Sequence, residues 1–148
     1  MRRPRKNAVG VVVTAAMAAG MFSGCAATDL AACSQAFERA ALTVDKVVSA
    51  EFECEESLGD SSQRGKIVLA VDTQESANPV IEDVYRAFAA EPDLDDSWLP
   101  NIEFAQESSE SHFSGLDVDL DFNGKPNLRD MREGYDINPT GADRTRSN

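Results

Sequence analysis

Five oxygen-bearing side chains lie close together near the C-terminal end of this 148-residue chain. They occupy the first, third, fifth, ninth and twelfth positions of residues 119–130: Asp119, Asp121, Asn123, Asn127 and Asp130. Hard cations such as Ca²⁺ take carboxylate and amide oxygens as ligands, and a glycine at the sixth position, here Gly124, permits the sharp turn that gathers them. The stretch is therefore a candidate calcium site, and Ca²⁺ is the one cofactor we consider for this chain.

Over these twelve residues the segment resembles the calcium loops of EF-hands and dockerins. It departs from those loops at Pro126, where they usually carry an aliphatic residue, and at Asp130, where an EF-hand has glutamate. A strand, rather than a helix, is also expected to lead into it. The alternative interpretation is structural: an amphipathic strand with its aspartates facing water, an Asn-Gly turn, and a helix begun by Pro126 or capped by Asn127.

The acidic segment Glu91–Ser97 is a second candidate for binding a cation, and the alternative is a solvated loop. His112 is the one histidine, and a lone histidine in a polar loop is more often a bystander than a base. The chain lacks a Gly-x-Ser-x-Gly motif, a Cys-x-x-Cys motif and a glycine-rich phosphate loop. Its aspartates fall at exposed positions, whereas acid–base catalysis by paired carboxylates needs one of them buried. We therefore expect no enzyme, and an envelope enzyme of unknown class is the lesser alternative.

Of the three cysteines, Cys25 is the most informative, because the residues before it form a recognisable leader. Met1–Asn7 carries four basic side chains, and Ala8–Phe22 is an uncharged apolar run. This layout is typical of a secretory signal peptide. The apolar run has about 15 residues, fewer than the roughly 20 that a membrane-spanning helix needs.

The end of this leader, Phe22-Ser23-Gly24-Cys25, resembles the lipobox of bacterial lipoproteins, with Phe22 in place of the usual leucine. The resemblance implies that the Cys25 thiol receives a diacylglycerol and that cleavage before it removes residues 1–24. The protein would then be held at the cell membrane on its extracytoplasmic face. Cleavage after Ala27, which gives a secreted protein, and an uncleaved anchor are the alternatives.

The charge of the chain limits its partners. All 26 acidic residues but only 10 of the 14 basic ones follow Gly24, so the chain from Cys25 onward carries about −16, compared with −12 for the whole sequence. Such a domain repels nucleic acid and anionic lipid headgroups. We therefore exclude nucleic acid as a partner, and consider the membrane, through the lipid, and another envelope protein.

The remaining two cysteines, Cys33 and Cys54, are predicted to form a structural disulfide. Cys33 lies on an apolar stripe of an expected helix, which Thr28 can cap, together with Leu30, Phe37, Ala40 and Val44. Cys54 alternates with polar residues in an expected strand whose inward positions are Val48, Ala50, Phe52 and Cys54. Both thiols would face the same core, in a compartment where disulfides persist. Two buried free thiols are the alternative.

The remaining elements follow in order. After a polar turn at Ser57–Gly65, a second strand is expected with Ile67, Leu69 and Val71 inward. A second helix, capped by Asn78 and opened by Pro79, carries Ile81, Val84 and Phe88. A third strand holds Ile102 and Phe104, a fourth runs over Leu116–Phe122, and a short helix with Leu128 and Met131 ends at Gly134. Trp98 and Phe113 are assigned to the rim of the core rather than to partner contacts.

These elements predict a single α+β domain with the order αββαββ and a final short helix. The sheet is expected to be four-stranded and largely antiparallel, with helices on one face and water on the other. The element order resembles a circular permutation of the ferredoxin-like arrangement. We divide the chain into a signal peptide (1–24), a lipidated tether (25–28), the α+β domain (29–136) and a disordered tail (137–148). The function we expect is a lipid-anchored, non-enzymatic binding module, and the alternative is a calcium-binding envelope module.

Overall fold

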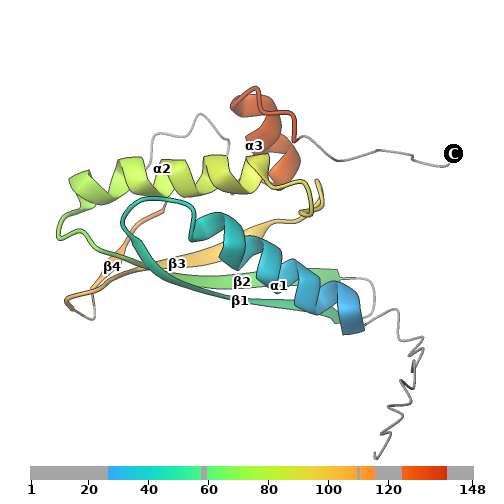
Figure 1. Ribbon diagram of the computed structural model, residues 1–148, viewed down its shortest axis with the longest axis horizontal. Coiled ribbons are helices and arrows are strands. Elements are labelled where there is room, and N and C mark those ends of the chain that lie inside the picture. The colour runs from blue at the N-terminus through green and yellow to red at the C-terminus, as the bar shows by residue number, and fades with distance from the viewer. Residues whose placement is uncertain (1–26, 58–59, 110, 116–124, 140–148) are drawn as a thin grey trace, which may run out of the picture.

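The computed structural model describes residues 27–57, 60–109, 111–115 and 125–139, which form three helices and a four-stranded sheet (Figure 1). The elements within this part of the chain are, in order, α1 (Ala27–Ala41), β1 (Val47–Ser57), β2 (Asp60–Leu69), α2 (Gln74–Ala90), β3 (Pro100–Gln106), β4 (His112–Phe113) and α3 (Leu128–Gly134). The predicted α+β class, the single domain and the order α-ββ-α-ββ-α are confirmed.

The strands lie in the order β1-β2-β3-β4. β1 pairs with β2 and β3 pairs with β4 in antiparallel fashion, whereas β2 and β3 are parallel because α2 connects them as a crossover. The sheet is therefore mixed. The ferredoxin-like arrangement is a split βαβ fold, with another strand between the two parallel ones. Here β2 and β3 are direct neighbours, so the resemblance covers the order of the elements and not the order of the strands.

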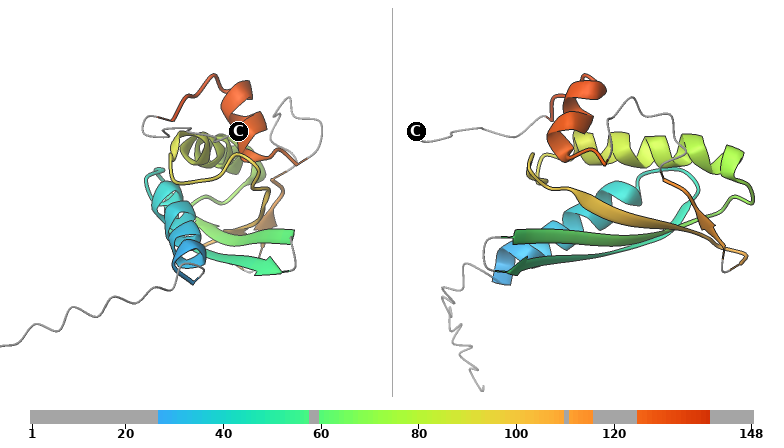
Figure 2. Two further views of the ribbon diagram at one scale, coloured as in Figure 1. Left: turned by 90° about the vertical axis from the view of Figure 1, so that its right-hand side faces the viewer. Right: turned by 180° about the vertical axis from the view of Figure 1, so that it is seen from behind.

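Helices α1 and α2 pack on the same face of the sheet, and the views in Figure 2 show the strands on one side of them. Phe52 of β1 reaches both helices, because its ring stacks on Phe37 of α1 at 4.8 Å and meets Phe88 of α2 edge-on at 5.7 Å. Ile67 and Leu69 of β2 are fully buried beside them, as their alternation predicted. Most of the hydrophobic stabilisation of the domain comes from this shared core.

The core includes the two aromatic residues at the loops. Trp98 is partly buried against the core, 6.0 Å from the Phe37 ring, and Phe113 is 9% exposed. Their assignment to the core is confirmed. Ile137, the first residue of the predicted tail, also packs against the core, and its backbone N–H donates to the Arg132 carbonyl at 2.9 Å. The fold therefore continues beyond residue 136, while residues 140–148 lie outside the described part of the chain.

Helix α2 begins earlier than predicted, since its N-cap is Thr73 and not Asn78. The Thr73 hydroxyl oxygen accepts from the Ser76 N–H at 3.2 Å, and the Ser76 hydroxyl oxygen accepts from the Thr73 N–H at 3.3 Å. This capping box satisfies two of the free N–H groups at the start of the helix. Pro79 lies inside the helix, where the Glu75 carbonyl loses its usual donor.

Two strand boundaries also differ from the prediction. The register of β1 shifts between Val47 and Ser49, so Val48 falls on a bulge and is 46% exposed, whereas Val47 packs against the core in its place. The polar stretch taken as a turn is largely strand, because the β1–β2 pairing continues to Ser57 opposite Asp60.

The structure describes a fourth strand that precedes the predicted one in the sequence. It is the two-residue β4, whose Phe113 pairs with Phe104 of β3. The predicted strand at Leu116–Phe122 lies outside the described residues.

Candidate functional site

The predicted calcium stretch is only partly described. Asp119, Asp121 and Asn123 lie outside the described residues, whereas Asn127 and Asp130 lie at the start of α3. The Asn127 Oδ1 atom accepts from the Asp130 N–H at 2.8 Å, and the Asp130 Oδ2 atom accepts from the Asn127 N–H at 3.3 Å. These bonds form a capping box, so both side chains have a structural role in starting the helix. Calcium binding by the stretch stays a prediction.

The predicted disulfide joins Cys33 of α1 to Cys54 of β1, with their Cα atoms 6.2 Å apart. It bridges the helix to the strand beneath it, across a sequence separation of 21 residues. Cys33 is 2% exposed, in agreement with its place on the apolar stripe. Cys25, the residue predicted to carry the lipid, precedes α1 and lies outside the described residues.

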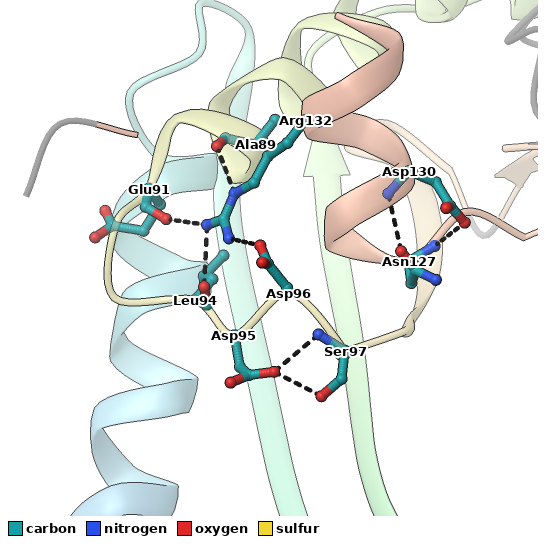
Figure 3. Close-up of polar contacts among 9 residues, drawn as sticks. All are labelled: Ala89, Glu91, Leu94, Asp95, Asp96, Ser97, Asn127, Asp130 and Arg132. Carbon is teal, nitrogen blue, oxygen red and sulfur yellow. Dashed lines mark hydrogen bonds and ion pairs between the residues drawn. The ribbon is translucent and has the colours of Figure 1, made fainter. Parts of the chain in front are cut away.

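The acidic segment after α2 surrounds a buried arginine that the sequence patterns did not single out (Figure 3). Arg132 of α3 is 7% exposed, and its guanidinium donates to the carbonyl oxygens of Ala89, Glu91 and Leu94 at 3.0, 2.7 and 3.0 Å. It also forms an ion pair with Asp96. A cation is favourable at this place, because the last carbonyls of a helix carry partial negative charge and α2 has no basic residue in its own last turn.

A second arginine ties the same segment to the first helix. Arg39, in the last turn of α1, contacts Glu91 Oε1 and Asp93 Oδ2, both at 2.9 Å. The hydrogen bond that Arg39 donates to Glu91 raises the pKa of the exposed Arg39 guanidinium. The segment predicted as a cation site or a solvated loop is therefore occupied by cations of the protein itself, Arg39 and Arg132.

An open hollow of about 230 Å³ lies beside Arg132. It is lined by residues of the acidic segment, of α3 and of the turn after it: Asp96, Arg129, Arg132, Glu133, Asp136, Ile137 and Asn138. Arg132 and Asp96 at this hollow form an ion pair with each other, and further N–H groups of Arg132 donate to backbone carbonyls. The geometry thus assigns these two groups to holding α3 in place rather than to acid–base chemistry.

The face of the sheet opposite the helices carries rows of exposed charges. In one row Glu51 of β1, Lys66 of β2 and Glu103 of β3 are cross-strand neighbours, with Lys66 Nζ 3.9 Å from Glu103 Oε1. In the next row Glu53 lies opposite Arg64. Cross-strand neighbours of opposite charge attract weakly, so these side chains remain available to water or to a partner.

Two further polar contacts lie on this face. His112 Nδ1 lies 3.2 Å from Glu103 Oε1, so the single histidine contacts the charged face. Lys125 Nζ donates to Asn101 Oδ1 at 2.8 Å. We name the exposed residues of β1, β2 and β3 in these rows the outer sheet face: Glu51, Glu53, Arg64, Lys66, Asn101 and Glu103.

Within the described ranges, no three His, Cys, Asp or Glu side chains come together in a group suited to a metal ion. No helix in the same ranges has the length and apolar character needed to cross a membrane. Comparison of the chain with protein-family models, with curated proteins and with solved structures gave no match.

Proposed function

We propose that this protein is a lipid-anchored extracytoplasmic lipoprotein that binds another envelope protein through its outer sheet face. The observation that carries the binding role is the division of the sheet. One face is buried under α1 and α2, whereas the opposite face presents its ordered rows of charge to the exterior. Ordered charges of both signs favour a specific protein partner, because complementary charges set orientation and exclude wrong partners.

The anchor is supported by the sequence of the leader and by the position of α1. The described helix begins at Ala27, two residues after Cys25, so a diacylglycerol on that thiol would hold α1 next to the membrane. Two acyl chains give stable attachment where one is marginal, since each buried methylene contributes about 0.8 kcal/mol. The Cys33–Cys54 disulfide agrees with an oxidising compartment outside the cytoplasm.

Metabolic labelling with a clickable palmitate analogue tests the anchor. We expect the wild-type chain to be labelled and the Cys25→Ser variant to lose the label. The Cys33→Ser variant, which removes a different thiol, is the control and should keep it. Label that persists in Cys25→Ser would refute attachment at this residue.

Charge reversal tests the interface. We expect Glu51→Lys combined with Glu53→Lys to abolish the recovery of a cross-linked partner from intact cells. The matched control is Glu75→Lys with Asp83→Lys, which makes the same change in charge at exposed positions of α2. Loss of the partner in the control alone, or recovery from both variants, would contradict a role for the outer sheet face.

Calcium binding by residues 119–130 is the second candidate function. It rests on the spacing of the five oxygen ligands, two of which, Asn127 and Asp130, lie together at the start of α3. The melting temperature of the purified protein, with millimolar calcium and then with chelator, is the test. A calcium-dependent rise that disappears in Asp119→Ala supports the site, and equal melting temperatures rule it out.

A further inference from the structure

Strand β1 forms one edge of the sheet, since β2 is its only partner strand among the described elements. It spans 11 residues. Alternate residues of an edge strand point their backbone N–H groups away from the sheet, and such groups can pair with another chain. Long edges of this kind are usually covered or blocked in native proteins.

Helix α1 blocks the middle of this edge with its side chains. The Phe52 N–H donates to Glu38 Oε1 at 3.1 Å, and the Cys54 N–H donates to Ser34 Oγ at 3.3 Å. Ser34 and Glu38 lie one helical turn apart on α1, as Phe52 and Cys54 lie two residues apart on β1. The spacing of the helix thus matches the spacing of the outward N–H groups of the strand.

The disulfide holds the helix at the same place. Cys33 is adjacent to Ser34 in sequence, and its bond to Cys54 ties this helical turn to the strand residue whose N–H the serine accepts. One turn further along α1, Phe37 stacks on Phe52. Cys33 is almost fully buried whereas Cys54 is half-buried, so Cys54 is the sulfur more open to attack.

We propose that the Cys33–Cys54 disulfide is a redox-sensitive clamp that keeps α1 over the edge of β1. A dithiol reductant opens it by exchange: its thiolate attacks the Cys54 sulfur, a mixed disulfide forms, and Cys33 leaves as a thiolate that takes up a proton. The second thiol of the reductant then releases Cys54, so the reductant becomes a disulfide and the protein gains two electrons and two protons. The freed turn of α1 leaves the edge, and the Phe52 and Cys54 N–H groups become available for strand pairing. The clamp does not depend on the lipid anchor or on the partner proposed above.

Amide hydrogen exchange measured by NMR tests the clamp residue by residue. The full-length chain with Cys25→Ser is used, so that Cys33 and Cys54 are its only thiols. On reduction with dithiothreitol, we expect the protection of the Phe52 and Cys54 amides to fall on the order of 100-fold, the scale of a loop-closing disulfide. The amides of Glu51 and Glu53, which alternate with them along β1 and face β2, should stay protected.

Two variants with the disulfide intact keep the test independent of folding after reduction. Ser34→Ala should lower the exchange protection of the Cys54 amide alone. Glu38→Ala should lower that of the Phe52 amide alone. Ser62→Ala, in β2, is the matched control and should change neither. The proposal is overturned if all four amides lose protection together on reduction, or if the Phe52 and Cys54 amides keep it.

Discussion

Helices α1 and α3 are both tied to the domain by specific contacts, but the main contact of each uses different chemistry. A disulfide and two side-chain-to-backbone hydrogen bonds hold α1 on β1. On α3, a buried guanidinium with three carbonyls and one carboxylate around it ties the helix to the end of α2, in addition to the buried Leu128 and Met131. A covalent tie acts largely by restricting the unfolded chain, whereas the arginine acts in the folded state, where its removal takes a donor away from several acceptors.

The largest loss of stability is expected on replacing Arg132. Arg132→Met should lower the free energy of unfolding by about 3–5 kcal/mol, because it leaves Asp96 and three carbonyl oxygens without their donor. Denaturant unfolding gives this value, and Arg129→Met, an exposed position on the same helix, is the control. A loss no greater than that of the control would mean that the arginine does not fasten α3.

Removal of the disulfide should follow in size. The Cys33→Ser, Cys54→Ser double variant is expected to lose about 3 kcal/mol, on the chain-entropy account of a loop of this length. Combined with Arg132→Met, the two losses should add to within about 0.5 kcal/mol, since the two fastenings have no partner in common. Strong coupling between them would show that the disulfide and Arg132 belong to one network and do not stabilise the protein independently.

The spacing of apolar residues predicted the contacts between α1 and β1 well. It placed Cys33 and Phe37 on one stripe of the helix and Phe52 and Cys54 on one face of the strand, and the structure joins them. Periodicity detects side chains that repeat locally, so it could not find Arg132, whose acceptors lie about 40 residues away and are mostly backbone atoms.

The boundaries that were missed also have local causes. Pro79 suggested a helix start capped by Asn78, although Thr73, five residues before that cap, forms a complete capping box with Ser76. The hairpin near Ser57 looked like a turn because both strands become polar on both faces beyond Cys54, where backbone pairing continues without burial. A bulge at Val48 left no signal at all, since valine fits either face.

A smaller loss of stability is expected on replacing Gly65, which tests the packing of β1 under α1. Gly65 lies opposite Phe52, and a Cβ there would meet the Phe52 ring at 2.3 Å. Gly65→Ala should cost about 1–3 kcal/mol, because the displaced ring is the one stacked under Phe37. Thermal unfolding measures it, and this loss should be non-additive with loss of the disulfide but additive with Arg132→Met.

The smallest expected effect is a gain in stability at the end of α3. Asp136 has φ 53°, and its N–H and that of Ile137 close the end of α3 on the carbonyls of Glu133 and Arg132. Glycine adopts this conformation without a Cβ penalty, so Asp136→Gly should stabilise the protein by about 0.5 kcal/mol. Asp136→Ala should destabilise it, and a melting temperature that rises for alanine would contradict this account of the helix end.

The central claim, that the outer sheet face is the binding surface of an anchored domain, is tested most directly by photo-crosslinking in living cells. A photoreactive amino acid is placed at Glu53, on that face, and in a separate strain at Asp83, exposed on α2. We predict a discrete adduct of one size from position 53 and none from position 83. Adducts from position 83 alone, or from neither position, would contradict the claim.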